Sequence, residues 1–160
     1  MKAISLWQPW ASLMAAGVKH NETRSWQTSH LGDLVVCSAK KRLGYLPVEL
    51  HGTVFEAFRY GEDDRTPLEL MEELPYGAAL CVVELFDYKW TGQLDPVFCP
   101  SWLTEKERSL GDYSPGRWAW ATRNCRRLRN PVPVKGRQGL FNLTPEEEKA
   151  VRAALPKGRP

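Results

Sequence analysis

Three ionisable side chains with complementary chemistry lie close together near the start of the chain: Lys19, Glu22 and Arg24. If residues 20–26 form a strand, Glu22 and Arg24 point to the same face, because successive strand residues alternate. The two cations would bind a phosphate, and the Glu22 carboxylate would accept a base N–H or act as a general base. The alternative is a structural ion pair that fixes the corner between a helix and a strand.

A glutamine and several tryptophans flank this cluster and would extend it into a pocket. Gln8, at the start of a predicted helix, either reads a base edge or caps its own turn. Trp10 and Trp26 are favoured to line the cleft, where stacking on a base contributes about 1–3 kcal/mol. Large aromatic residues more often belong to the core, and we assign three there: Trp7, Trp118 and Trp120.

Basic residues gather in one long segment, because residues 117–137 contain seven of them and no acidic residue. Six are expected to contact a nucleic-acid backbone, which gives affinity without sequence choice: Arg123, Arg126, Arg127, Arg129, Lys135 and Arg137. Residues 40–42 form a second basic cluster, in which Lys40 lies close to the Ser38 hydroxyl, a further candidate ligand contact. The alternative for both segments is a set of solvated charges.

The composition is ordinary for one globular domain: 160 residues, 42% hydrophobic, 26% charged, with a net charge of +3. The four cysteines and three histidines have no metal-ligand spacing, so neither a metal site nor another cofactor is expected. No leader segment and no run long enough to span a membrane is visible. A cytoplasmic, reducing setting without a membrane partner is the resulting expectation.

The elements that must position these residues form an α+β domain, predicted to be a partly closed β-barrel with flanking helices. Strands are expected at 2–6, 20–26, 34–38, 78–90, 118–122 and 136–143, and helices at 10–16, 47–60, 68–73 and 104–108. Residues 123–133 are expected to form a basic turn with extended flanks. The domain would span residues 1–143, and a C-terminal helix starting at Thr144 and a disordered tail (157–160) would occupy residues 144–160.

Several motifs in order resemble one family. They are Ser5-Leu-Trp-Gln-Pro-Trp, Gly17-Val-Lys19 followed by Glu22-Thr-Arg24, the segment Gly32–Lys41, the segment Gly77–Leu85, Trp118-Ala-Trp and the segment Pro131–Phe141. Together they are similar to the ASCH domain family, whose core pattern is Gly-x-Lys-x-x-Glu-x-Arg, over nearly all of residues 4–143. The resemblance implies a PUA-like β-barrel and a role in RNA binding or RNA metabolism.

Two classes of function follow from the resemblance. The first is an RNA-binding or nucleotide-binding module, with single-stranded nucleic acid or a modified nucleoside as its partner. The second is a small hydrolase, a ribonuclease or a nucleoside amidohydrolase, with Lys19 and Glu22 as the acid–base pair. The amidohydrolase relatives have Lys-x-x-Thr, whereas here Glu22 takes the place of the threonine and Thr23 would face the other way. A third possibility, a protein-interaction adaptor, depends on the acidic segment 62–73.

Overall fold

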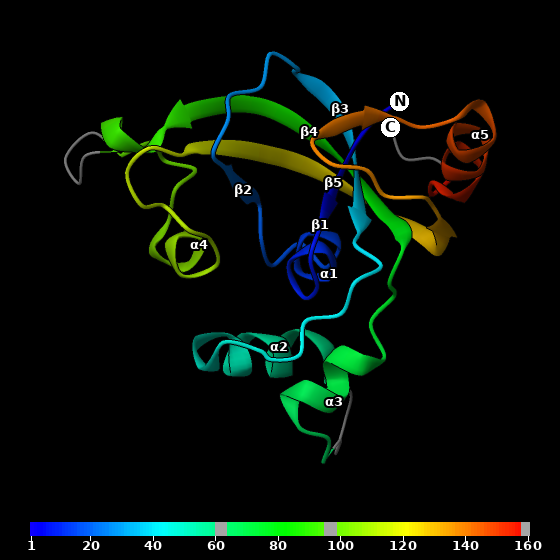
Figure 1. The fold of residues 1–160 in the computed structure, drawn as a ribbon, viewed down its shortest axis with the longest axis horizontal. Helices are drawn as coiled ribbons and strands as arrows, with labels where there is room; N and C mark the ends of the chain where they lie inside the picture. Colours follow the sequence, from blue (N-terminus) through cyan, green and yellow to red (C-terminus); the bar gives the residue numbers. More distant parts are fainter. Residues whose placement is uncertain (60–63, 95–98, 158–160) are drawn as a thin grey trace.

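The computed structural model describes residues 1–59, 64–94 and 99–157. The strands of this part form one mixed sheet of six in the order β2-β5-β4-β3-β1-β6. Figure 1 shows the two longest strands, β4 and β5, arching over helix α1, so that the sheet forms a half-barrel. The predicted α+β fold, a partly closed barrel with flanking helices, is confirmed.

The two longest strands lie next to each other inside the sheet, and the short ones lie towards its edges. Their bounds are β1 Lys2–Leu6, β2 Asn21–Arg24, β3 Gly32–Ser38, β4 Ala78–Trp90, β5 Trp118–Pro133 and β6 Leu140–Asn142. Strand β1 runs parallel to β3, while all the other neighbours are antiparallel. The two outer strands, β2 and β6, are therefore short, which limits the exposed edge of the sheet.

The helices connect and cover the sheet (Figure 1). Their bounds are α1 Trp10–Ala15, α2 His51–Phe58, α3 Pro67–Glu72, α4 Glu105–Ser109 and α5 Pro145–Ala154, with 3-10 turns at Val48–Leu50 and Thr91–Gln93. Thr66 and Thr144 each close a capping box with the glutamate three residues later, which explains why α3 and α5 start where the sequence predicted. Of the predicted tail, residues 158–160 lie outside the described residues.

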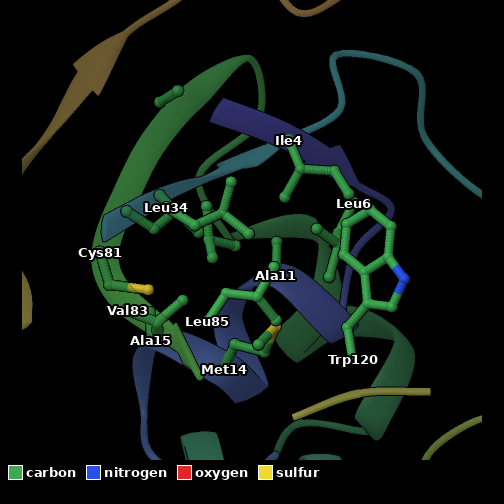
Figure 2. Close-up of a cluster of buried hydrophobic side chains, with 13 residues drawn as sticks. Ile4, Leu6, Ala11, Met14, Ala15, Leu34, Cys81, Val83, Leu85 and Trp120 are labelled. Atoms are coloured by element: carbon green, nitrogen blue, oxygen red, sulfur yellow. The ribbon is translucent and has the colours of Figure 1, made fainter. Parts of the chain in front are cut away.

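Two clusters of buried side chains stabilise the sheet from opposite faces. Figure 2 shows the first, where Met14 and Ala15 of α1 pack against strand residues and Trp120. The Trp120 ring is fully buried and meets Trp26 edge-to-face, with 4.8 Å between the ring centroids. The second cluster lies under α5, whose Val151 is fully buried. The sheet is thus held between α1 and α5. The ends of β1 and β2 lie beside α1, where a pocket lies.

The prediction of a basic turn at 123–133 is wrong, because these residues continue strand β5. Strand β4 pairs with β5 as far as the contact of Ala78 with Pro133. Two residues of β5, Asn124 and Cys125, face only Val83, and Asn124 takes up this bulge with a φ of 53°. Asparagine tolerates that left-handed conformation better than most residues. The polar composition of residues 123–133 therefore belongs to an exposed strand with a bulge.

The other departures are at element boundaries and in one untested segment. Strand β2 is shorter than the expected 20–26, and a 3-10 turn precedes α2. Residues 62 and 63 of the acidic segment lie outside the described residues.

Among the helices of the described residues, none combines the length and the apolar composition that crossing a membrane requires.

Candidate functional site

A pocket of ≈ 540 Å³ lies at the end of β1, between β2, the start of α1, and the segments 43–50 and 109–117. Its ionisable lining residues are Lys19, Glu22, Arg24, Glu49, Asp112 and Arg117, and its aromatic ones are Trp7, Trp10 and Tyr45. Lys19, Glu22 and Arg24 therefore share one cavity. The structure brings the three side chains into one pocket lining, while their roles stay predictions.

The Glu22 carboxylate joins the two cations of the motif. Its Oε1 lies 3.2 Å from Arg24 Nε, and its Oε2 lies 3.8 Å from Lys19 Nζ. Arg24 also donates from Nη2 to the carbonyl of Ser5, at 3.0 Å. The guanidinium is thus fixed by a carboxylate and a carbonyl. Among the described residues no hydrogen bond or ion pair uses Arg24 Nη1, so this nitrogen remains for a ligand.

Lys19 is an almost fully buried lysine, with 2% of its surface exposed. Its Nζ donates to the carbonyl of Leu110 at 3.1 Å. Burial disfavours the charged ammonium and lowers the pKa of Lys19 below its ordinary value, although the carboxylates of Glu22 and Glu107 oppose this effect. A lysine of lowered pKa in a polar pocket is a feature of functional sites.

Lys19→Met tests this burial through the pH dependence of stability. Because the folded pKa of Lys19 is lowered, the unfolded chain binds more protons between that pKa and the ordinary value of 10.5. The contribution of Lys19 to the free energy of unfolding therefore rises with pH in that window. In denaturant titrations between about pH 7 and 10, we expect the wild type to gain stability relative to Lys19→Met. A pH-independent difference would contradict the lowered pKa.

Arg117 is a second guanidinium in the pocket, and strand pairing brings it there. Arg24 of β2 faces Trp118 of β5, so Arg117 comes next to the motif. Its Nη1 lies 3.3 Å from Asp112 Oδ2, and its Nη2 donates to the carbonyl of Thr23 at 3.3 Å. Hydrogen bonds from Ser114 hold the pKa of Asp112 below its usual range, and Arg117 adds to this.

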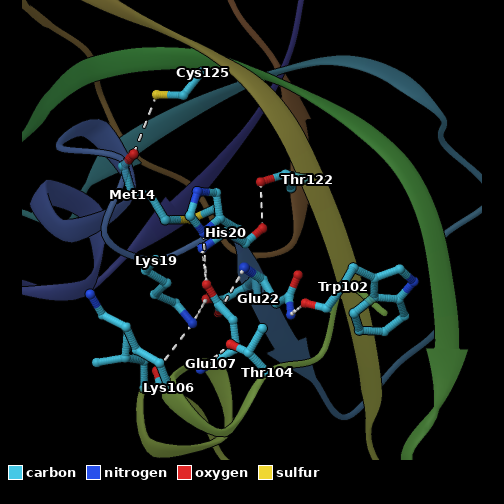
Figure 3. A network of polar contacts seen from close by, with 12 residues as sticks. Met14, Lys19, His20, Glu22, Trp102, Thr104, Lys106, Glu107, Thr122 and Cys125 are labelled. Atoms are coloured by element: carbon cyan, nitrogen blue, oxygen red, sulfur yellow. Dashed lines mark hydrogen bonds and ion pairs between the residues drawn. The ribbon is translucent and has the colours of Figure 1, made fainter. Parts of the chain in front are cut away.

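The buried carboxylate of Glu107 attaches α4 to the start of β2 (Figure 3). It accepts hydrogen bonds from the backbone N–H groups of His20, at 2.6 Å, and of Asn21, at 3.1 Å. His20 Nδ1 also lies 3.0 Å from Glu107 Oε1. These contacts fix the backbone directly after Lys19, so Glu107 orients the pocket without lining it.

Aromatic rings surround the mouth of the pocket. Trp7 is 39% exposed and Tyr45 is 66% exposed, while Trp10, also in the lining, is half-buried. Lys41 Nζ lies 5.4 Å from the centroid of the Trp7 ring, within cation–π distance. The prediction that Trp7 belongs to the core is wrong, because α1 begins three residues later and leaves the indole at the rim.

Four predicted ligand contacts lie elsewhere among the described residues. Gln8 is buried and donates to Ser12 Oγ and the Pro75 carbonyl, so it fixes α1. Trp26 packs on Trp120. Ser38 exchanges hydrogen bonds with the backbone of residue 78. Lys40 lies beside the turn at residue 77, outside the pocket lining. The expectation that Gln8 and Trp26 line the pocket is therefore wrong, and the contacts of Ser38 and Lys40 with a ligand stay predictions outside it.

None of the six basic residues assigned to a nucleic-acid backbone lines this pocket. Arg123 pairs with Glu84, and Arg126 pairs with Asp33. Arg129 and Arg137 donate to the carbonyls of Ala153 and Asn142. The other two, Arg127 and Lys135, are exposed. The six thus spread over β5 and the segment after it, and their contact with a nucleic acid stays a prediction.

No group of three or more potential metal ligands occurs among the described residues.

Four pocket residues were not predicted from the sequence: Trp7, Tyr45, Asp112 and Arg117. Arg117 was counted with the basic segment, but nothing in its spacing links it to Arg24. Only the pairing of β2 with β5 makes that connection.

The half-barrel around α1, with a polar pocket where β1 and β2 end, defines a domain of the PUA-like fold class. The model of the ASCH domain matches residues 4–130. The chain therefore belongs to the ASCH domain family, which is known for RNA-binding PUA-like domains.

Relatives and solved structures agree with this assignment. The chain is 27% identical over 154 residues to mouse (Mus musculus) activating signal cointegrator 1, and 29% identical over 157 residues to the human (Homo sapiens) protein. These matches cover 96% of the chain but 24% of each relative, so it spans about a quarter of their length. The ASCH protein of Zymomonas mobilis has the same fold, with a TM-score of 0.55 at 15% identity, covering 97% of this chain and 95% of that one.

Proposed function

We propose that this domain binds single-stranded RNA by taking one nucleotide into the pocket between Arg24, Arg117 and Trp7. The observation that carries the proposal is the presence of two guanidiniums in one cavity whose mouth is lined by exposed aromatic rings. Guanidiniums bind phosphate in bidentate fashion, and aromatic rings stack on any base. Membership of the ASCH family supports the same ligand class.

The dimensions and charges of the pocket fit one nucleotide better than a duplex. A volume of ≈ 540 Å³ lies in the range of small-ligand sites, about 300–1,000 Å³. Three cations are matched by three carboxylates, Glu22, Glu49 and Asp112. Attraction to a polyanion is therefore local, through Arg24 Nη1 and the second N–H of each Arg117 Nη nitrogen. The carboxylate oxygens have further lone pairs that would accept base or ribose donors.

Fluorescence anisotropy with a labelled single-stranded oligoribonucleotide of about 12 nucleotides tests the proposal. Binding is expected to weaken as salt is added, with a slope of about −0.7 in log K per log salt for each phosphate contact. A duplex of the same sequence should bind less tightly, because its bases are not free to stack. Equal affinity for both forms, or binding that does not depend on salt, would contradict the proposal.

Trp7→Ala tests the stacking contact at the mouth. Since the ring is 39% exposed and belongs to none of the buried clusters, its loss should leave the fold intact. Affinity for the oligoribonucleotide is expected to fall about tenfold, the effect of losing one base-stacking contact. Trp90→Ala is a matched control, because Trp90 is 41% exposed and outside the pocket. Equal losses in both variants would show that Trp7 has no specific role.

The second candidate function is hydrolysis of RNA or of an acylated nucleoside. Lys19 favours it, because burial lowers the pKa of its amine and Glu22 lies 3.8 Å away in the same pocket. A neutral Lys19 would act as a general base towards water, and Glu22 would hold the resulting ammonium. In strand β2, Asn21 and Thr23 are buried while Glu22 and Arg24 are partly exposed, so Thr23 and Glu22 lie on opposite faces of the strand, although Thr23 also contributes to the pocket lining.

Incubation with mixed RNA and a panel of acylated nucleosides separates the two candidates. Wild type is compared with Lys19→Ala and Glu22→Ala. Turnover that both substitutions abolish would establish the hydrolase. Turnover that survives both would exclude these residues as the acid–base pair, and binding without turnover favours the first function. The cytoplasmic setting and the backbone contacts of residues 123–137 stay predictions.

A further inference from the structure

Two cysteines from neighbouring strands lie beside the C-terminal half of α1. Cys81 of β4 is fully buried in the cluster with Met14 and Ala15 (Figure 2). Cys125 of β5 is exposed, and its thiol donates to the carbonyl of Met14 at 3.3 Å (Figure 3). The two thiols therefore lie beside α1 within hydrogen-bond reach of each other, Cys81 inside the core and Cys125 at its surface.

Strand register places the two side chains on one face of the sheet. Cys81 faces Arg127, and Cys125 is two residues before Arg127 on the same strand. Residues two apart in a strand share a face, so Cys125 is the diagonal neighbour of Cys81. The bulge at Asn124 and Cys125 lies at this point, where the chain departs from regular pairing. Such a segment adapts its backbone more readily than a regular ladder does.

The surroundings divide the two thiols into a reactive and a resolving partner. A hydrogen bond from the Cys81 thiol lowers the pKa of Cys125, and the cations of Arg127 and Arg126 add to this against the effect of burial. The same hydrogen bond and burial raise the pKa of Cys81. Cys125 is thus the exposed thiol whose pKa is shifted towards the thiolate, which is the nucleophilic form.

The other cysteines lack this combination. Cys37 is fully buried, which raises its pKa to about 12. Cys99 donates to the carbonyl of Leu103 at 3.5 Å and accepts from Arg108 Nη2 at 3.2 Å. It is partly buried, and no other cysteine is recorded in contact with it among the described residues. Within the described residues, Cys81 and Cys125 are the two that pair a surface thiol with a second thiol.

We propose that Cys125 and Cys81 form a peroxide-oxidised thiol pair that closes into a disulfide between β4 and β5. The Cys125 thiolate attacks one oxygen of hydrogen peroxide, giving the sulfenic acid and hydroxide. The Cys81 sulfur then attacks the sulfenic sulfur. The S–S bond forms as the S–O bond breaks, and the Cys81 proton leaves with the hydroxyl group as water. One peroxide oxidises two thiols, and two water molecules are produced once the hydroxide regains the proton first lost by Cys125.

Mass spectrometry of the native full chain after hydrogen peroxide treatment and alkylation tests the proposal. The wild type is expected to lose two hydrogens and to yield a cross-linked peptide containing Cys81 and Cys125. Cys125→Ser should abolish the link, and Cys81→Ala should leave a sulfenic acid at Cys125 that dimedone traps. Cys99→Ser is the control and should behave as the wild type.

Three results would overturn the pair. They are faster oxidation of Cys99 than of Cys125, a two-hydrogen loss that persists in Cys125→Ser, and wild-type protein that stops at the sulfenic acid without a link. Because the readout is the covalent state of the two sulfurs, it does not depend on RNA binding. Circular dichroism of both variants shows whether the fold is kept, and Cys125→Ser is expected to keep it because the side chain is exposed.

Discussion

Replacement of Arg24 and Arg117 together by alanine should weaken binding of single-stranded RNA by at least about 100-fold. Each guanidinium would lose charge-assisted hydrogen bonds to phosphate, and such bonds contribute about 1.5–3 kcal/mol each. The two side chains line the same pocket from β2 and from the residue before β5. Anisotropy titrations at several salt concentrations would also show a slope smaller by about 1.4, since two single-strand phosphate contacts are removed.

The matched control removes two positive charges far from the pocket. Lys149→Ala with Arg152→Ala, on α5, changes the net charge by the same amount and leaves the pocket lining intact. We expect an effect below about threefold, because long-range electrostatics are screened beyond about 10 Å at 0.1 M salt. If both double variants lost the same affinity, general charge rather than the pocket would explain binding.

Glu107→Ala is expected to reduce the free energy of unfolding by about 3 kcal/mol. The substitution leaves the N–H groups of His20 and Asn21 without their acceptor, and each buried unpaired donor costs about 1–3 kcal/mol. For a chain of this size the melting temperature should fall by roughly 6–12 °C. Thermal unfolding followed by circular dichroism measures the change.

Two further variants separate this role of Glu107 from its charge. Glu107→Gln keeps one acceptor oxygen and should lose less stability than Glu107→Ala. Glu105→Ala changes an exposed residue of the same helix and should alter stability by less than about 0.5 kcal/mol. An equal effect of Glu105→Ala and Glu107→Ala would show that α4 as a whole, and not the contact with β2, determines stability.

The features predicted correctly from the sequence are those that the local spacing of residues determines. Glu22 and Arg24 were placed on one face because strand residues alternate, and the structure brings them together at 3.2 Å. Strand β4 has the predicted bounds, because apolar residues and the turn at residue 77 delimit it. Helices α3 and α5 start at their predicted threonine caps.

Long-range contacts explain what the sequence did not predict. Arg117 reaches the pocket only through the pairing of β5 with β2, strands that are about 90 residues apart in the sequence. Trp7 reaches the rim of the pocket because α1 begins after it, at Trp10. Gln8 has the residue type of a base-reading group, yet its amide is used inside the fold. The charged composition of residues 123–133 suggested a turn, whereas pairing with β4 makes them a strand. Composition cannot distinguish an exposed strand from a turn when half of the residues face solvent.

The most direct measurement of nucleotide binding in the pocket is a titration of ¹⁵N-labelled protein with a short single-stranded oligoribonucleotide, followed at the tryptophan indole N–H resonances. The chain has seven tryptophans, and they divide between the pocket and other sites. The indole signals of Trp7 and Trp10 are expected to shift, while those of the buried Trp120 and the distant Trp90 stay in place. Unchanged signals of Trp7 and Trp10 at a concentration of RNA that saturates binding would contradict the account.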